Sequence, residues 1–301
     1  MNKTQKGVWL AVVAAIISGI AVFVNKFAVG VITPPLIFTA TKNFGVGLLI
    51  VSVLLVTGKW KQVKALKRGE LIKLGLIGVI GGSIPFYLFF TGLAQTSAAG
   101  AQIINKSLVL WVALLAIPLL KEKLSLLQVA AVAVLFSANA FVGGFTGLKF
   151  SNGELMVLAA TMLWAVEHVI AKKVLATVDP DLVTGARMGL GSVILVVAAQ
   201  VVKPGAIFAF TSLNSVQWMW MVATMATLLT YVMVWYRAIK LAPVSLVASV
   251  LVGATLVTNL LSAVLVTHVW SGEMLVQAAV SVGALGVLVW GMKARQREVL
   301  A

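Results

Sequence analysis

Long apolar runs, interrupted by proline, glycine and short clusters of charge, cover most of the chain. Each run holds about 20 residues, the length that an α-helix needs to cross the hydrocarbon core of a bilayer. The runs predict ten transmembrane helices, at residues 7–29, 34–57, 71–93, 97–120, 125–146, 153–176, 180–202, 215–240, 244–267 and 271–292. Strands of a membrane β-barrel alternate apolar and polar residues over short segments, so these unbroken runs favour an all-α polytopic membrane protein.

One segment between the second and third runs is too polar to span a membrane. In residues 58–70, Trp60, Val63 and Leu66 fall on one helical face and lysines stand opposite. This pattern is typical of a helix lying in the membrane interface, with its apolar face in the lipid. We therefore expect a short interfacial linker here, on the cytoplasmic side.

The composition narrows the class further. Hydrophobic residues make up 61% of the 301 positions and charged residues 10%, whereas soluble domains have about 45–50% and about 25%. These values exclude an ordinary cytosolic enzyme, a disordered chain and a nucleic-acid-binding module. The chain has no cysteine, and His168 and His268 are too far apart in sequence for a metal-binding motif. We expect no metal and no cofactor.

The positive charges predict a direction for the helices, because cytoplasmic loops of membrane proteins carry an excess of lysine and arginine. If the N-terminus is cytoplasmic, ten helices place only Lys149 and Lys203 outside, and four residues (Lys26, Lys42, Lys106 and Arg187) within spans. The cytoplasmic side then holds Lys3, Lys6, Lys59, Lys61, Lys64, Lys67, Arg68, Lys73, Lys121, Lys123, Lys172, Lys173, Arg237, Lys240, Lys293, Arg295 and Arg297. This partition predicts an inner- or plasma-membrane protein with both termini in the cytoplasm.

The two halves of the chain partly match each other at an offset of 146 residues. The matched pairs include Gly7 with Gly153, Lys26 with Lys172, Pro34 with Pro180, and Gly45 with Gly191. Residues 1–146 and 147–301 then form two repeats of five helices. Because five is odd, the second repeat must be inverted relative to the first. Inverted repeats are typical of secondary transporters, whose substrate site lies between the repeats near the middle of the membrane.

Several segments resemble a known family across nearly the whole chain. They are residues 120–124, 236–240 and 153–173 (with Trp164-Ala165), together with a basic residue, Lys42, in the second helix. The chain is similar to the EamA family of the drug/metabolite transporter superfamily. The resemblance implies ten helices in two inverted repeats, and export or exchange of small metabolites, often amino acids. Relatives handle sugar phosphates and nucleotide sugars, and His268, the counterpart of Glu122, departs from the family pattern, so the substrate subclass stays open.

The chain lacks the nucleotide-binding motif of ATP-driven pumps, so any transport by this chain alone is either driven by a gradient of substrate or ion or passive. We expect a small-molecule substrate and a lipid bilayer as its partners, whether the protein is a monomer or a homodimer. Two alternatives are an exchanger of anionic or phosphorylated metabolites and, more distantly, an intramembrane enzyme. An enzyme would need a nucleophile with its base or a metal site, and the sequence supplies neither.

Glu167 is the only acid well inside a predicted span, about midway along it. One interpretation is a structural ion pair with Arg187, and the other is a carboxylate that couples transport to protons. His168 is adjacent, but neighbouring residues point about 100° apart on a helix, so the two need not interact. We interpret His168 as a hydrogen-bonded packing residue.

The embedded lysines are the candidate substrate-binding groups. Lys26, Lys42 and Lys106 lie in the outer half of the first repeat, and each adjoins an asparagine: Asn25, Asn43 and Asn105. Gln102 shares a face with Lys106. We expect a cavity in which these groups attract a carboxylate or phosphate, the alternative being snorkelling of the lysines to the surface. The aromatic residues expected to line the cavity, or else to pack, are Tyr87, Trp111, Trp164, Tyr231, Trp235 and Phe86.

Small and polar residues in several spans are expected to join helices rather than to bind a ligand. The glycines of this kind are Gly78, Gly81, Gly82, Gly283 and Gly286, and the polar residues are Thr255, Asn259 and Ser262. Glycine lets two membrane helices approach closely, and hydroxyl and amide side chains bond across helix pairs.

Overall fold

The computed structural model describes residues 1–32, 35–96, 98–122, 125–142, 151–205, 208, 211–270 and 272–300. These residues form helices and connecting turns, with no strand among them. The elements of the first half are α1 (Lys3–Val31), α2 (Pro35–Val56), the 3₁₀ helix η1 (Lys59–Ala65), α3 (Arg68–Gly82), α4 (Ile84–Leu93), α5 (Ala98–Lys106), α6 (Leu108–Leu120) and α7 (Leu126–Val142). Those of the second half are α8 (Asn152–Val174), α9 (Pro180–Gly185), the π-helical turn η2 (Ala186–Leu190), α10 (Gly191–Val202), α11 (Ser215–Leu241), α12 (Val244–Leu251), α13 (Ala254–Ser262), the π-helical turn η4 (Ala263–Thr267) and α14 (Gly272–Leu300).

Eight stretches of the described chain are long and apolar enough to cross a membrane. They correspond to eight of the ten predicted spans, and α7 and α14 occupy the positions of the other two with shorter apolar stretches. Large side chains on the outer helix faces, such as Leu55, Leu114 and Val197, are more than half exposed. Soluble monomers rarely expose so much contiguous apolar surface, so the protein is a multi-pass membrane protein.

Three predicted spans are interrupted, although the sequence pattern predicts each as one helix. The third breaks at Ser83, because Pro85 two residues later has no N–H to continue the helical bonds. The fourth breaks at Ser107, whose hydroxyl donates to the carbonyl of Ile104 at 2.6 Å. The ninth breaks at residues 252–253, where glycine lowers helix stability. The second and third of these breaks are 146 residues apart, which is the offset of the sequence repeat.

The predicted interfacial linker is shorter than expected. Its only helical turn among the described residues is η1, which is mostly exposed. From Arg68 on, the chain already belongs to α3, so the third span begins before residue 71. The capping box between Lys67 and Glu70 explains this early start, because the Glu70 carboxylate accepts the Lys67 N–H at 2.8 Å. Lys149 and the end of the predicted span 125–146 lie outside the described residues.

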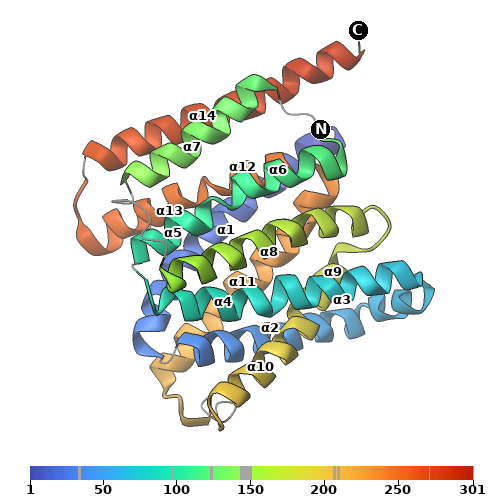
Figure 1. The fold of residues 1–301 in the computed structure, drawn as a ribbon, viewed down its shortest axis with the longest axis vertical. Coiled ribbons are helices and arrows are strands. Elements are labelled where there is room, and N and C mark those ends of the chain that lie inside the picture. The colour runs from blue at the N-terminus through green and yellow to red at the C-terminus, as the bar shows by residue number, and fades with distance from the viewer. Residues whose placement is uncertain are drawn as a thin grey trace.

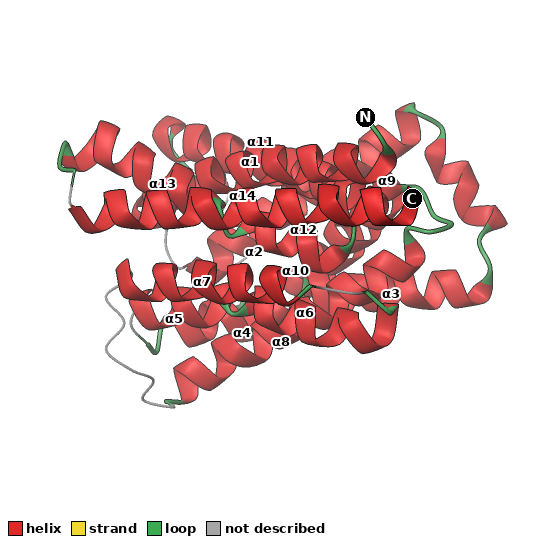
Figure 2. Cartoon of the chain, turned by 90° about the horizontal axis from the view of Figure 1, so that it is seen from above, coloured by secondary structure: helices red, strands yellow, loops and turns green. Residues whose placement is uncertain are grey.

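The helices run side by side along one direction, and each half packs its helices on those of the other (Figure 1). The first helix of one half packs on the third span of the other: α1 on α11, and α8 on α3 and α4. α7 and α14 pack on each other at the edge of the bundle. In both views the beginning of α1 and the end of α14 lie at the same end of the bundle, as an even number of crossings requires (Figure 2).

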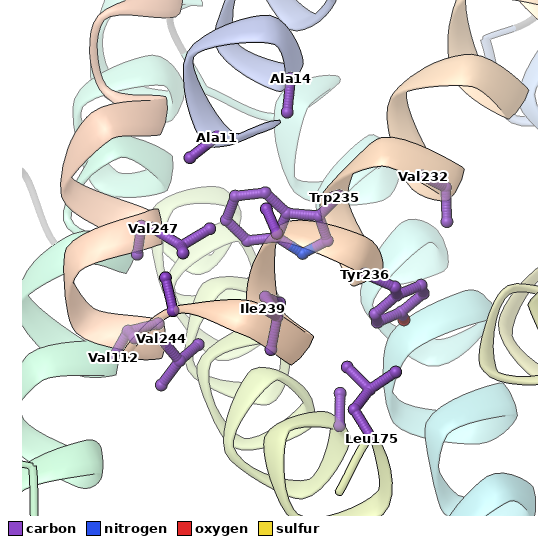
Figure 3. Close-up of a cluster of buried hydrophobic side chains, with 14 of the residues drawn as sticks. Ala11, Ala14, Val112, Leu175, Val232, Trp235, Tyr236, Ile239, Val244 and Val247 are labelled. Atoms are coloured by element: carbon purple, nitrogen blue, oxygen red, sulfur yellow. The ribbon is translucent and has the colours of Figure 1, made fainter. Parts of the chain in front are cut away.

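The largest apolar core lies where the two halves meet (Figure 3). Trp235 and Tyr236 of α11 are fully buried there. Ala11 and Ala14 of α1 and Val112 of α6 come from the first half, and Val244 and Val247 of α12 come from the second. The small side chains of α1 let α11 and α12 approach closely, so the core itself holds the halves together.

Glycines confirm part of the packing prediction. A methyl group on Gly78 would lie 3.0 Å from the Ala186 carbonyl oxygen, and Gly81 and Gly82 are as crowded against Glu167 and Arg187. Gly283 and Gly286 of α14 meet nothing within 4 Å, so the prediction is wrong for them. Spacing alone does not reveal which face of α14 is turned toward a neighbour.

Candidate functional site

Four polar side chains meet in the second half and form what we call the buried polar cluster: Glu167 and His168 of α8, Arg187 of η2 and Tyr236 of α11. The Tyr236 hydroxyl donates to Glu167 Oε1 at 2.6 Å. Arg187 Nη1 lies 3.5 Å from Glu167 Oε2 and 3.4 Å from the Tyr236 oxygen. The predicted partners Glu167 and Arg187 are therefore together, and all four side chains are buried.

The fold brings this cluster together through close helix packing. The π-helical turn η2 carries Arg187, and α3 lies directly against it. A methyl group on Gly82 would lie 1.9 Å from the Arg187 carbonyl oxygen, and one on Gly81 would lie 2.6 Å from Glu167 Cγ. The Trp164 indole N–H donates to the Gly81 carbonyl at 3.1 Å. The first half thus contributes glycine residues of α3, and Glu167 and Arg187 of the second half pack directly against them.

Two expectations about Glu167 need correction. It lies seven residues before the end of α8 rather than midway, so the cluster is nearer the end of the bundle where α9 begins. His168 does pack, edge-on to Trp235 with ring centroids 5.0 Å apart. Its Nδ1 lies 2.9 Å from Glu167 Oε2, but neither ring nitrogen makes a hydrogen bond with a described residue, so the prediction of a hydrogen-bonded His168 is wrong. Neighbouring Cβ atoms diverge on a helix, but the long Glu167 side chain bends back toward the imidazole.

Lys42 is buried in α2 next to α1, with 5% of its surface exposed. Its ammonium donates to Asn25 Oδ1 at 3.0 Å and lies 4.9 Å from the centre of the Phe38 ring. The Thr39 hydroxyl and the Asn43 amide are fully buried, and neither has a hydrogen-bond partner among the described residues. We call these four polar residues, Asn25, Thr39, Lys42 and Asn43, the lysine site.

The other predicted polar residues of the first half lie apart from this site. Lys26 and Gln102 are exposed, while Asn105 and Lys106 are half-buried. Lys106 has no ion-pair partner in the described part of the chain. No described contact joins it to Lys42, since α5 packs on α8 and α2 packs on α10 and α11.

The predicted aromatic residues mostly pack against one another. Trp164 contacts the rings of Phe86 and Phe89, and Tyr231 stacks on Trp235 with centroids 5.9 Å apart. The Trp111 indole N–H donates to the Ser107 hydroxyl at 3.1 Å, at the break between α5 and α6.

Tyr87 lines a pocket of about 300 Å³ between α4 and α10. Its other lining residues, including Leu195 and Val202, are almost all apolar. Val202 is exposed on the outer surface, so this pocket suits an acyl chain better than a polar substrate.

Charged residues that the sequence analysis did not single out join the two halves at the end of the bundle. Lys59 lies 2.6 Å from Asp181 and 3.1 Å from Asp179, and Arg237 lies 2.6 Å from Asp181. We call these four residues the end cluster. Asp179 also caps α9 by accepting the Asp181 N–H at 2.8 Å. An aspartate directly before a proline that begins a helix was the signal available in the sequence.

The pKa values of two end-cluster residues reflect these contacts. The pKa of Lys59 is raised by its hydrogen bond to Asp181 and then by Asp179, although partial burial opposes the shift. Burial alone would raise the pKa of Asp179, but the Asp181 N–H and the Lys59 ammonium hold that pKa below its ordinary value. Both groups are therefore charged at neutral pH.

Glu122 reaches from the end of α6 to the second half. Its carboxylate accepts the backbone N–H groups of Val244 and Ser245, at 2.7 and 3.1 Å, and also the Ser245 hydroxyl. These N–H groups begin α12 and have no partner within that helix. An acid at this positive end of the helix dipole is stabilising, so Glu122 caps a helix of the other half.

The fold and these embedded charges define a multi-pass membrane protein with two similar halves. The sequence profile of the EamA-like transporter family matches residues 5–144 and again 151–291, one match to each half. The chain belongs to this family, within the drug/metabolite transporter superfamily.

Individual relatives agree with this assignment. The chain is 25% identical over 193 residues to the uncharacterized transporter YyaM of Bacillus subtilis (strain 168), covering 62% of each protein. It is 24% identical over 145 residues to an uncharacterized transporter of Methanothermobacter thermautotrophicus, covering 46% of this chain and 42% of that one. The matches thus span less than two thirds of either relative. A crystal structure that is 18% identical shares the fold, with a TM-score of 0.79 over 94% of this chain and 97% of that one.

Proposed function

We propose that the protein is a secondary transporter that exports or exchanges small organic metabolites, such as amino acids, across the inner or plasma membrane. The observation that carries this proposal is the family match to both halves of the chain. The pairing of α1 with α11, and of α8 with α3 and α4, supports two five-helix halves that are inverted relative to each other. Alternating access then exposes a site between the halves to one side at a time.

The residues that we assign to the substrate site are those predicted from the sequence: Lys26, Lys42, Asn43, Gln102, Asn105, Lys106, Tyr87, Trp111, Trp164, Tyr231 and Trp235. Lys42 and Asn43 have the strongest support, because they are buried polar groups with few protein partners. Lys26 has the weakest support, because its exposed position suits snorkelling to the surface.

We also propose a coupling role for Glu167, the acid of the buried polar cluster. Its contacts with Arg187, Tyr236 and His168 support an ion pair that holds α8, η2 and α11 together. A proton on Glu167 would weaken the attraction to Arg187, which is how protonation would favour one arrangement of these helices over another. The structural and the coupling roles make different predictions, which we give in the Discussion.

A second candidate is an exchanger of anionic or phosphorylated metabolites. It is favoured by one observation, the burial of the Lys42 ammonium beside a neutral amide. A buried cation without a counter-charge is costly in a membrane, and an anionic substrate would supply that charge.

Counterflow in liposomes tests the proposed function. Purified protein is reconstituted in vesicles loaded with an unlabelled metabolite, and the same labelled metabolite is added outside. The panel contains amino acids, organic acids and sugar phosphates. We expect vesicles with the protein to take up at least one of these labelled compounds faster than protein-free vesicles do. The recovered label should be chemically unchanged, since a modified product would favour an intramembrane enzyme. Absence of counterflow across the panel would contradict the proposal.

A further inference from the structure

We propose that the lysine site binds the anionic group, carboxylate or phosphate, of a small organic anion, with Lys42 as the residue that reads the charge. The inference rests on the proposed transport function and names the substrate class of its site. Lys42 lies seven residues after the start of α2, about 10 Å along the helix axis. Lys42 therefore lies within the membrane-spanning part of α2 and not at its end.

The two halves of the chain differ in the residues that surround their embedded basic residues. With the repeat offset of 146, Lys42 corresponds to position 188 (42 + 146), one residue from Arg187. Arg187 has an acid and a tyrosine beside it, Glu167 and Tyr236. The first-half counterparts of these two positions are 21 (167 − 146) and 90 (236 − 146), where the chain has Ala21 and Phe90. The second half places an acid beside its embedded cation, and the first half has neither an acid nor a tyrosine at the corresponding positions.

None of the described residues supplies the missing acid to Lys42. The first acidic residue in the sequence is Glu70, so neither α1 nor α2 contains one. Of the elements that pack on α2, namely η1, α4, α9, η2, α10 and α11, only α9 contains an acid, Asp181. Asp181 lies at the opposite end of α2, where it holds Lys59 and Arg237. Lys42 therefore has no acidic counter-charge among the described residues, and a bound anion would supply one.

The surroundings of Lys42 match the needs of an oxyanion. Asn25 is fixed by its own bond, since its amide nitrogen donates to the Ala21 carbonyl at 2.7 Å while its oxygen accepts from Lys42. Thr39 and Asn43 are one turn apart on the same face of α2. Their buried hydroxyl and amide lack partners among the described residues. Such groups are costly unless a ligand or water bonds them, and an oxyanion offers several acceptors as well as charge.

Thermal unfolding of the purified full chain in detergent tests this site with defined probes. The probes are sodium salts of mono- and dicarboxylates with two to six carbons and of sugar phosphates. Neutral amides and free sugars at the same ionic strength serve as controls. We expect the wild type to be stabilised by at least one anion and not by its neutral analogue. The carboxylate and phosphate arms identify which oxyanion is bound.

Three variants locate the effect. Lys42→Gln should weaken the anion about tenfold or more, because it removes the charge. Asn25→Asp should do the same, because it gives Lys42 an internal carboxylate at the same place, and the new ion pair offsets the loss of the hydrogen bond to the Ala21 carbonyl. Lys61→Gln is the matched control, an exposed lysine in η1, the 3₁₀ helix that follows α2, and should respond as the wild type does.

The site is wrong if the wild type shows no anion-specific stabilisation, or if Asn25→Asp keeps the full response. If Lys42→Gln does not fold, Asn25→Asp alone decides. Counterflow of an anionic metabolite that is unchanged in both variants would leave the transporter in place and remove the anion site. Anion binding at Lys42 without counterflow of any metabolite would do the reverse.

Discussion

Gly82 shows how much the buried polar cluster depends on single atoms. It is the residue at which α3 touches η2, and even a methyl group there would collide with the backbone at Arg187. Backbone cannot move aside as a flexible side chain can. We predict that Gly82→Ala lowers stability by about 1–3 kcal/mol or more, the usual cost of overpacking. Gly75→Ala in the same helix is the control and should be nearly neutral, because nothing lies within 4 Å of it. Thermal unfolding in detergent measures both, and equal effects would contradict the packing described.

Substitutions of Glu167 distinguish a structural role of this residue from a role in proton coupling. Removing one partner of a buried ion pair costs about 3–5 kcal/mol. If the pair is structural, Glu167→Gln should lower stability strongly, and exchanging the two residues (Glu167→Arg with Arg187→Glu) should restore it. If Glu167 is the proton site, Glu167→Gln should abolish the pH dependence of flux and leave substrate exchange. Glu154→Gln on the same helix is the control, because that acid only caps α8. A well-folded Glu167→Gln protein with unchanged pH-dependent flux would exclude the proton role.

The sequence predicts individual residues of the site unevenly. Glu167 and Arg187 stand out because charge is rare within apolar runs, and their pairing follows from lying on successive spans. Tyr236 is not predicted as their partner, since nothing in the sequence places α11 beside α8 and η2. The partners of Lys42 are hidden in the same way: Asn25 lies 17 residues earlier and reaches it only because α1 and α2 meet at that depth.

Glu122 makes the start of α12 dependent on the first half. We predict that Glu122→Gln costs about 1 kcal/mol, the typical worth of a helix cap, because the amide keeps the shape but loses the charge that suits the helix dipole. Glu273→Gln, an exposed acid in the first turn of α14, should change stability much less. Thermal unfolding is the measurement, and a Glu122→Gln protein as stable as the control would contradict the cap.

The end cluster joins η1, α9 and α11, and the pKa shifts of its residues Asp179 and Lys59 lead away from neutral pH. The lowered pKa of Asp179 means that its stabilising contribution is present above about pH 4 and is lost as the pH falls through the lowered value. The raised pKa of Lys59 means that its contribution is present below about pH 10 and is lost as the pH rises through the raised value. We therefore predict that Asp179→Asn lowers stability but leaves the shape of the flux profile between about pH 5 and 9 unchanged. If Asp179→Asn instead shifts the midpoint of the flux profile within that range, the group that titrates there belongs to the end cluster and the prediction is wrong.

The sequence predicts the positions of the spans better than it predicts the breaks within them. Apolar length predicts eight spans that the structure describes, with ends close to those expected. The interruptions at Ser83, Ser107 and residues 252–253 are not visible in hydrophobicity, because broken and continuous helices need the same apolar surface toward lipid. They depend on a few backbone hydrogen bonds.

The direction of the whole molecule in the membrane rests on charge counting, and labelling tests it. The chain has no cysteine, so single cysteines can be introduced without background. Reagents that cannot cross the membrane should label cysteines at positions 149 and 203 in intact cells, and should miss those at 64 and 295. Labelling of position 64 would overturn the arrangement with ten helices and a cytoplasmic N-terminus.

The break in the ninth span divides it into two separately anchored rods. α12 is seated on Glu122 of the first half. α13 is tied to α1 through Thr258, which donates to the Gly19 carbonyl at 2.9 Å, and to α14 through Asn259, which donates to Gln277 at 2.7 Å. Because a helix is stiff and its break is not, the far end of α13 can change its tilt while the start of α12 stays bound to Glu122 and packed on α1. The matching break at Ser107 gives the fourth span the same kind of joint. If the two halves alternate access as we propose, these two joints are where the fourth and ninth spans would bend.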